Sequence, residues 1–236
     1  MTAGRDEILG AIRRSLGRSG PVDDSRAAEL RARMAKPARN LIPARADLPP
    51  SEVIDLFRSQ AEGVFATVDR VADMSEVPQV LTEYLKRENL PSQVVMAPDP
   101  SLDQAPWDNQ PLLEIRRCLP VESDMVSVTS APAAIAETGT LAMFSGADHP
   151  STLNFLPETH VVVLPVNRIG KNYEDVWDLI RQRIADGEGD LNDLMPRTVN
   201  LITGPSRSGD IEQTLLLGAH GPRRLHIILV DSDDAA

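Results

Sequence analysis

A short polar turn near the C-terminus holds residue types that bind anions. The apolar run Val199 to Ile202 leads into Thr203-Gly204-Pro205-Ser206-Arg207-Ser208-Gly209-Asp210-Ile211-Glu212. A strand, a small polar turn and a helix start together present several free backbone N–H groups to an anion. Arg207 adds a guanidinium, which can form two parallel hydrogen bonds to a carboxylate or phosphate. The pattern predicts an anion-binding turn, with an ordinary capped strand-to-helix connection as the alternative.

Five neighbours of Arg207 are further candidate ligand-binding residues. They are Gly204, Ser206, Ser208, Asp210 and Glu212. The serine hydroxyls can cap the expected helix or bind a ligand oxygen, and the two carboxylates fall in its first turn, where negative charge suits the helix dipole. An ion pair between Arg207 and a carboxylate, from Glu137, Asp210 or Glu212, is the alternative to ligand recognition.

A second turn, Glu137-Thr138-Gly139-Thr140, is crowded with small residues. Small residues let a backbone and a ligand approach closely, so Thr138, Gly139 and Thr140 are candidate ligand-binding residues. A partly desolvated carboxylate at Glu137 can act as a base or a nucleophile, which makes Glu137 a candidate catalytic residue. The alternative is a carboxylate that backbone N–H groups or an arginine hold, and that only pins the turn.

The histidines suggest acid–base chemistry rather than metal binding. His220, in Gly218-Ala219-His220-Gly221-Pro222, is a candidate general base or proton shuttle for a hydroxy acid. Capping of a helix carbonyl is the alternative. His149 and His160 are interpreted as structural. No two of the four histidines stand at helical metal-ligand spacing, so no metal site is predicted.

Charge divides the chain into a basic head and an acidic body. Residues 1–50 hold ten Lys and Arg against six Asp and Glu, a net charge of +4, whereas residues 51–236 hold fourteen against twenty-nine, a net charge of −15. The acidic body argues against general nucleic-acid binding. The basic head is expected to contact an acidic partner or the body itself.

The single cysteine, Cys118, excludes an internal disulfide. It also excludes an iron–sulfur cluster or a Cys-rich zinc site that this chain alone would ligate, so no cofactor is expected in it. The N-terminus lacks the apolar core of a secretory signal, and no apolar run is long enough to span a bilayer. These features predict a soluble cytoplasmic protein.

The hydrophobic pattern alternates between helical and strand periods, which predicts an α/β fold. Residues 1–50 form an arm with helical segments at 6–16 and 24–35, and residues 51–236 form one domain. Strands are expected at 64–68, 93–97, 125–129, 141–144, 160–164, 199–203 and 225–230, and helices at 51–63, 75–88, 172–186 and from 210. We expect a mostly parallel sheet covered on both faces, with ligands at the carboxyl ends of its strands.

Four motifs in one order resemble the LutC/YkgG family, the LUD-domain proteins linked to lactate utilisation. They are Ile135-Ala136-Glu137-Thr138-Gly139-Thr140, Leu156-Pro157-Glu158-Thr159-His160-Val161-Val162-Val163, the turn from Thr203 to Glu212, and Gly218-Ala219-His220-Gly221-Pro222. The resemblance runs from about Phe57 to Val230. It implies a three-layer α/β fold similar to the NagB/RpiA/CoA-transferase group of glucosamine-phosphate isomerase, ribose-phosphate isomerase and CoA transferases.

The resemblance also implies a function. The chain would be a subunit of a three-protein system that oxidises L-lactate to pyruvate, with the iron–sulfur clusters in its partners and a small anionic metabolite bound here. Whether this subunit is itself catalytic stays open. Two alternatives remain: a stand-alone CoA-transferase-like or phosphosugar-isomerase-like enzyme, since Glu137-Thr138-Gly139 resembles the Glu-x-Gly of CoA transferases, and a regulatory protein that senses a small acid through Arg207.

Overall fold

The computed structural model describes residues 2–18, 20, 22–187, 195–208 and 216–231. The chain forms two compact units, Met1–Leu41 and Ile42–Ala236. Residues 42–50, predicted to belong to the arm, fall in the second unit, and Ala46 there is 1% exposed.

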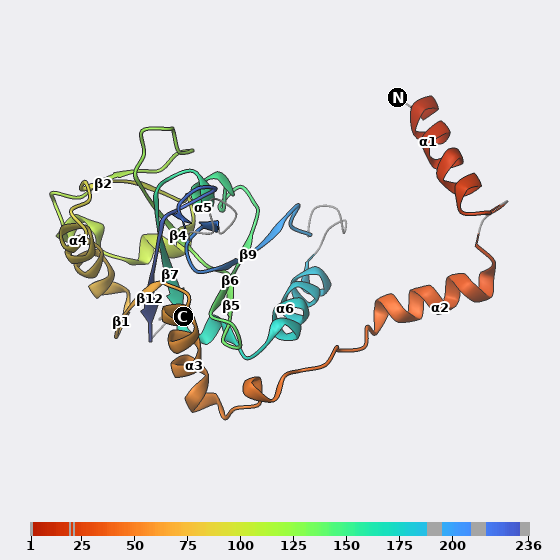
Figure 1. Cartoon of the computed structure of the whole chain (residues 1–236), viewed down its shortest axis with the longest axis horizontal. Coiled ribbons are helices and arrows are strands. Elements are labelled where there is room, and N and C mark those ends of the chain that lie inside the picture. Colours follow the sequence, from red (N-terminus) through yellow and green to blue (C-terminus); the bar gives the residue numbers. More distant parts are fainter. Residues whose placement is uncertain (1, 19, 21, 188–194, 209–215, 232–236) are drawn as a thin grey trace. The chain divides into compact units, whose positions relative to one another are not determined.

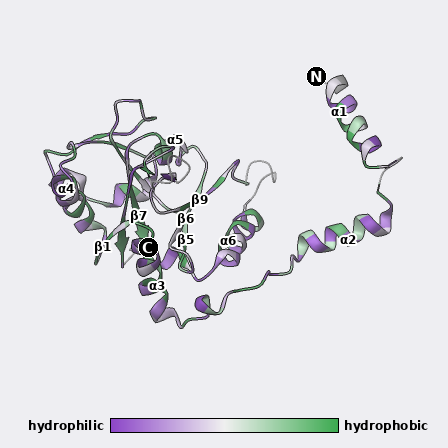
Figure 2. Ribbon diagram, viewed as in Figure 1, coloured by the Kyte–Doolittle hydropathy of each residue, from purple (hydrophilic) through white to green (hydrophobic). Residues whose placement is uncertain are grey.

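The first unit consists of two helices, α1 (Thr2–Ser15) and α2 (Asp24–Ala35). The side chain of Asp23 caps α2 by accepting a hydrogen bond from the Arg26 N–H at 2.8 Å, and α2 buries no residue. Ile8, Ile12 and Leu16 of the α1 segment are exposed. Hydrophobic and hydrophilic residues alternate along both helices, as expected for an arm without a core of its own (Figure 2).

The main sheet of the second unit has six parallel strands in the order β1-β12-β7-β4-β2-β3. Their bounds are β1 Thr67–Val71, β2 Gln93–Met96, β3 Glu114–Arg116, β4 Val126–Ser130, β7 Thr159–Pro165 and β12 Arg224–Val230. All residues of β4 and β7 are buried, because a parallel strand in the centre of a sheet is covered on both faces. The prediction of an α/β fold with a mostly parallel sheet is confirmed.

A second sheet has four strands in the order β8-β5-β6-β9. Their bounds are β5 Ala133–Ile135, β6 Thr140–Phe144, β8 Ile169–Gly170 and β9 Val199–Thr203. The turn at 136–139 joins β5 and β6 into an antiparallel hairpin, and β9 pairs antiparallel with β6. A further short antiparallel pair joins β10 (Arg207–Ser208) and β11 (Leu216–Leu217).

The helices of this unit are α3 (Pro50–Gly63), α4 (Val77–Arg87), α5 (Thr152–Phe155) and α6 (Tyr173–Asp186). Short 3-10 turns lie at Ala44–Ala46, Met74–Glu76, Pro100–Gln104, Trp107–Asn109 and Val166–Arg168. The predicted helix at 51–63 begins one residue earlier, at Pro50. Pro49 is the N-cap of α3 and makes no side-chain capping bond. Pro50 takes the first helical position, which suits proline because the residue there needs no N–H for the helix.

The predicted strand at 64–68 begins later, at Thr67. The cause is the end of α3, where Val64 caps the helix and Phe65 takes a positive φ of 73°. That conformation belongs to a turn rather than to a strand. The pattern predicted α6 well, and this helix starts with a capping box between Asn172 and Asp175.

Three apolar cores hold the layers together. The first lies between α4 and one face of the six-stranded sheet, the second between the other face, α3 and the β5–β6 hairpin, and the third between the hairpin and α6. Figure 1 shows this order from left to right as α4, β12 and β7, the hairpin, and α6. Figure 2 shows β5, β6 and β7 as predominantly hydrophobic, as strands in the middle of these layers must be.

In the part of the chain that the structure describes, no helix is both long and apolar enough to cross a membrane.

Candidate functional site

The two candidate turns pack against the same end of α3. A Cβ on Gly139 would lie 2.3 Å from the Ala61 nitrogen, and a Cβ on Gly204 would lie 2.2 Å from the Val64 oxygen. Both glycines also have a positive φ, 62° at Gly139 and 71° at Gly204. Only glycine allows both the conformation and the close approach, so these two residues fix the turns to α3.

Threonine hydroxyls connect the two turns. Thr140 pairs with Thr203 in the β6–β9 ladder, and their hydroxyl oxygens lie 2.7 Å apart. The hydroxyl of Thr138 lies 2.7 Å from that of Thr140 and 3.2 Å from that of Tyr173. These hydroxyls are therefore engaged with one another, and a ligand-binding role for Thr138, Gly139 and Thr140 stays a prediction.

Glu137 is 6% exposed and its carboxylate has an arginine partner. Arg45 Nη2 lies 3.2 Å from Glu137 Oε1, and the Glu137 N–H donates to the carbonyl oxygen of Lys171 at 3.0 Å. This is the geometry expected of a carboxylate that pins a turn. The role of Glu137 as a base or nucleophile stays a prediction.

Arg207 and His220 line one cavity of about 310 Å³. Gly204, Ser206 and Pro222 line it as well, whereas Glu137 is not among its described lining residues. The two turns thus share the end of α3, but the structure does not place the Glu137 carboxylate in the cavity with the Arg207 guanidinium.

Hydrogen bonds join the two walls of this cavity. The Ser206 N–H donates to the carbonyl oxygen of Pro222 at 2.8 Å, and the Gly218 N–H donates to that of Ser206 at 2.9 Å. The His220 N–H donates to Ser206 Oγ at 3.3 Å, which leaves the Ser206 hydroxyl proton available for another acceptor. The backbone N–H of Ser206 is therefore used within the protein and is not available to an anion.

The guanidinium of Arg207 lies over the ring of Phe65, 5.6 Å from its centroid, and the residue is exposed. Stacking on a ring orients a guanidinium and leaves its N–H edge free for hydrogen bonds. Ser208 pairs with Leu216 in the short β10–β11 ladder and is not among the described residues that line the cavity. Asp210, Glu212 and the helix expected from Asp210 lie outside the described residues.

His160, for which a structural role was predicted, also lines the cavity. It is 0% exposed, and its Nε2 lies 2.8 Å from the hydroxyl of Thr129. Its Nδ1 has no hydrogen-bond partner among the described residues. Burial lowers the pKa of His160 to about 3, so the imidazole is neutral near pH 7. The one feature of the sequence that could have pointed to His160 as a cavity residue is its polar ring at the start of an otherwise apolar strand.

The cavity lies beside the amino ends of β7 and β12, not at the carboxyl ends of the strands as expected. His160 and Leu225 are the second residues of these strands and are register partners. The β9 residues Leu201 to Thr203 face them from the second sheet. The second sheet, which was not predicted from the sequence, forms one wall of this cavity.

A polar cluster occupies the carboxyl ends of β2 and β4 instead. Asp99, which is 7% exposed, accepts hydrogen bonds from the hydroxyls of Ser130 and Ser101, and His149 Nε2 lies 3.8 Å from its carboxylate. Burial alone would raise the pKa of Asp99, but the hydrogen bonds from Ser130 and Ser101 outweigh it and lower the pKa below its ordinary value. Asp99 is thus a satisfied carboxylate that ties loops to the sheet.

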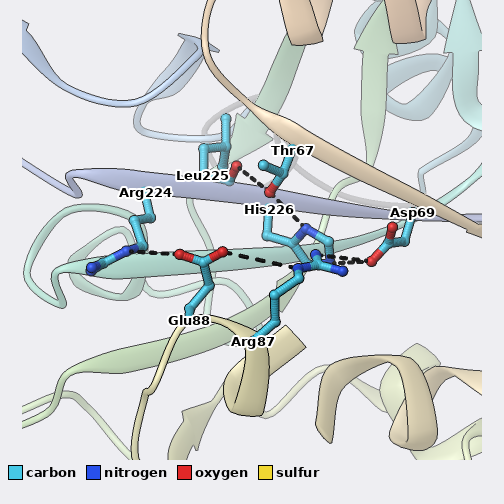
Figure 3. A network of polar contacts seen from close by, with 7 residues as sticks. All are labelled: Thr67, Asp69, Arg87, Glu88, Arg224, Leu225 and His226. Atoms are coloured by element: carbon cyan, nitrogen blue, oxygen red, sulfur yellow. Dashed lines mark hydrogen bonds and ion pairs between the residues drawn. The ribbon is translucent and has the colours of Figure 1, made fainter. Parts of the chain in front are cut away.

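A second buried histidine, His226, belongs to a polar network between β1, α4 and β12 (Figure 3). Its Nδ1 lies 2.9 Å from the Thr67 hydroxyl, its Nε2 lies 3.5 Å from an Asp69 oxygen, and its ring stacks on Tyr84 at 3.9 Å. Burial lowers the pKa of His226 to about 4 despite the Asp69 charge. Arg87 contacts Asp69, so the network joins α4 to the edge of the sheet.

Among the described residues, no group of three or more His, Cys, Asp or Glu side chains could hold a metal ion. Cys118 is exposed and free.

Comparison with known proteins agrees with this fold. The family model of the LUD domain matches residues 122–230. Lactate utilization protein C of Bacillus subtilis is 38% identical over 109 residues, which cover 46% of this chain and 43% of that protein. Its counterpart in Bacillus licheniformis is 36% identical over 110 residues, 47% of this chain and 44% of that protein. The Bacillus velezensis counterpart is 28% identical over 182 residues, which cover 75% of this chain and 72% of that protein.

The first two alignments span less than half the length of those curated relatives. The crystal structure of a DUF162 family protein from Deinococcus radiodurans superposes with a TM-score of 0.55 at 22% identity, covering 78% of this chain and 99% of that one. The resemblance found in the motifs is confirmed: the LUD-domain family model matches residues 122–230, and the aligned curated proteins are named Lactate utilization protein C.

Proposed function

We propose that this chain takes part in lactate utilisation. The observation that carries the proposal is the similarity to proteins named Lactate utilization protein C, at up to 38% identity over 109 residues. The matching LUD domain, residues 122–230, contains both candidate turns and the described residues that line the Arg207 cavity. The similarity therefore includes the part of the molecule in which a ligand would bind.

Within such a system, this chain would be the subunit that lacks iron–sulfur clusters. The whole sequence has one cysteine, and Cys118 is exposed and free. Iron–sulfur clusters are usually held by four cysteine thiolates, so cluster ligation falls to partner proteins in this proposal. The contribution of the chain would be to bind a small anionic metabolite or to assemble the partners.

The Arg207 cavity supports the binding role. The guanidinium at its edge suits a carboxylate, and the Ser206 hydroxyl and the His220 ring add polar groups on the facing segments. A cavity of about 310 Å³ is at the lower end of the range typical of small-molecule sites. We take Arg207 as the anion-binding residue of the proposed function.

Growth on L-lactate tests the role directly. Deletion of the gene is expected to abolish growth with L-lactate as carbon source and to leave growth on pyruvate unchanged, because only the oxidation step is lost. Complementation with the intact gene should restore growth. Normal growth of the deletion strain on L-lactate would remove the proposal.

The division of labour needs a second experiment. A tagged full-length chain, purified gently from cells grown on L-lactate, is expected to bring iron-containing partners with it, whereas the isolated chain should be colourless and contain no iron. Efficient lactate oxidation by the isolated chain would show that it is an enzyme in its own right.

A further inference from the structure

The wall of the Arg207 cavity includes two buried polar residues, whose presence the exposed arginine does not explain. Arg207 and His220 are exposed, whereas His160 is 0% exposed and Asn154 is 4% exposed, and all four line the cavity. Buried polar side chains are almost always hydrogen-bonded, so a buried polar atom without a partner in a cavity wall requires an explanation.

That atom is Nδ1 of His160, which has no hydrogen-bond partner among the described residues. The other ring nitrogen, Nε2, is already engaged with the Thr129 hydroxyl at 2.8 Å. A neutral imidazole has one donor and one acceptor nitrogen, and the Thr129 hydroxyl can serve either one. Nδ1 therefore presents either a donor or an acceptor, according to which tautomer forms.

A hydroxyl group is the ligand group that suits this nitrogen best, because a hydroxyl both donates and accepts. A keto oxygen only accepts, so it would suit one of the two tautomers alone. Asn154, which also lines the cavity, offers both an amide donor and a carbonyl acceptor and is a second candidate partner for such a hydroxyl.

The rest of the wall defines the other parts of the ligand. Arg207 provides a bidentate partner for a single carboxylate, and Ile202, Pro222 and Leu225 provide apolar contacts. The cavity of about 310 Å³ admits a short acid with a small alkyl portion.

We infer that this cavity binds a short hydroxy monocarboxylate, with the carboxylate on Arg207 and the hydroxyl on His160 and Asn154. The inference rests on the proposed function in taking the cavity as a ligand site, and it adds the ligand class and two residues. His160 is a binding residue in this arrangement.

Pairs of acids that differ by one hydroxyl provide the test. Purified full-length protein is titrated calorimetrically with L-lactate and propionate, and with 3-hydroxybutyrate and butyrate. In at least one pair, the hydroxy acid is expected to bind at least tenfold more tightly than its deoxy partner. Failure of all four acids to bind, or equal affinity within both pairs, would overturn the inference.

Variants assign the two ends of the site. His160→Phe is expected to abolish the preference for the hydroxy acid while weak binding of the deoxy acid persists, and His160→Gln, which keeps a donor and an acceptor, should restore part of the preference. Arg207→Gln should weaken both acids of a pair by at least tenfold. Arg181→Gln, on the exposed surface of α6, is the matched control and should bind like the wild type.

Thermal unfolding of each variant identifies folding failures. If His160→Phe does not fold, the comparison of His160→Gln with the wild type decides, because a preference fully unchanged in that variant would contradict contact with the hydroxyl. The growth experiment is independent of these titrations. Loss of growth on L-lactate without a hydroxyl preference overturns the ligand class alone, whereas hydroxy-acid binding with normal growth of the deletion strain overturns the lactate role alone.

Discussion

The Arg45 guanidinium lies 3.2 Å from the carboxylate of Glu137, 92 residues further along the chain. The Arg45 side chain is half-exposed and that of Glu137 is buried. The pair therefore lies between the turn of the β5–β6 hairpin and the solvent. A buried carboxylate with an arginine partner is well suited to holding a turn, and this relationship leads to the first prediction.

Glu137→Gln is expected to destabilise the protein by ~1–3 kcal/mol, because a charge-assisted bond to Arg45 is lost at a buried position. Urea unfolding measures the change, and Glu52→Gln on the exposed face of α3 is the control, with an effect within ~0.5 kcal/mol. Mass spectrometry after incubation with acyl-CoA tests the competing interpretation. A covalent adduct on Glu137 that is absent from the Gln variant would establish it as a nucleophile.

Gly139→Ala and Gly204→Ala are each expected to destabilise the protein by roughly 2–5 kcal/mol, combining the cost of a positive φ with that of overpacking against α3. Thermal unfolding measures the loss. Gly63→Ala, where an added Cβ meets nothing within 4 Å, is the matched control and should be neutral or slightly stabilising. Wild-type stability in both turn variants would contradict the prediction, because it would mean that α3 can shift away from the added Cβ at little cost.

Much of the fold could be predicted from the sequence because buried parallel strands are apolar and helices show their period. The runs at 125–129 and 160–164 correspond to β4 and β7, and the helical pattern at 172–186 to α6. The hairpin strand Ala133–Ile135 was missed, because three small or apolar residues have no period of their own. Only tertiary packing between the two sheets makes it a strand.

The candidate site shows the same limit. Arg207 and His220 stood out as polar residues in glycine-rich turns, and the structure brings them to one cavity. His160 was interpreted as structural because its surroundings in the sequence are those of a core strand. Its contact with Thr129 crosses 31 residues, and its place in the cavity depends on β9 from the other sheet. Neither the contact with Thr129 nor the proximity to β9 can be recognised in the sequence around His160.

The hydroxyl chain between the two turns gives a third prediction. Thr140 is 0% exposed, and its hydroxyl lies 2.7 Å from those of both Thr138 and Thr203. Thr140→Val is expected to cost ~1–3 kcal/mol of unfolding free energy, since it leaves two hydroxyls without that partner. The double change with Thr203→Val should cost less than the sum of the single changes, because the two residues share one bond.

Urea unfolding of the two single variants and the double variant measures this coupling. Thr152→Val, at an exposed position of α5, controls for the substitution itself and should change stability by less than ~0.5 kcal/mol. Strict additivity of the two single changes would show that the bond contributes nothing.

The buried histidines predict how stability depends on pH. Burial lowers the pKa of His226 to about 4 and that of His160 to about 3, from the ordinary value of 6.5. The folded state therefore excludes protons that the unfolded state takes up below pH 6.5, so stability is fully present above that pH. It is lost as the pH falls toward 4, with a slope of up to ~1.4 kcal/mol per pH unit for each histidine.

Urea unfolding at several pH values between 4.5 and 7.5 is expected to show this loss, and His226→Gln should reduce its slope because one of the two protonations is removed. Thr82→Val on α4, which removes a hydroxyl bond to the carbonyl oxygen of Pro78 but no titrating group, should lower stability at every pH and keep the slope. An unchanged slope in His226→Gln would mean that its ring accepts a proton in the folded state. In that case the Asp69 carboxylate, 3.5 Å from Nε2, would compensate for burial.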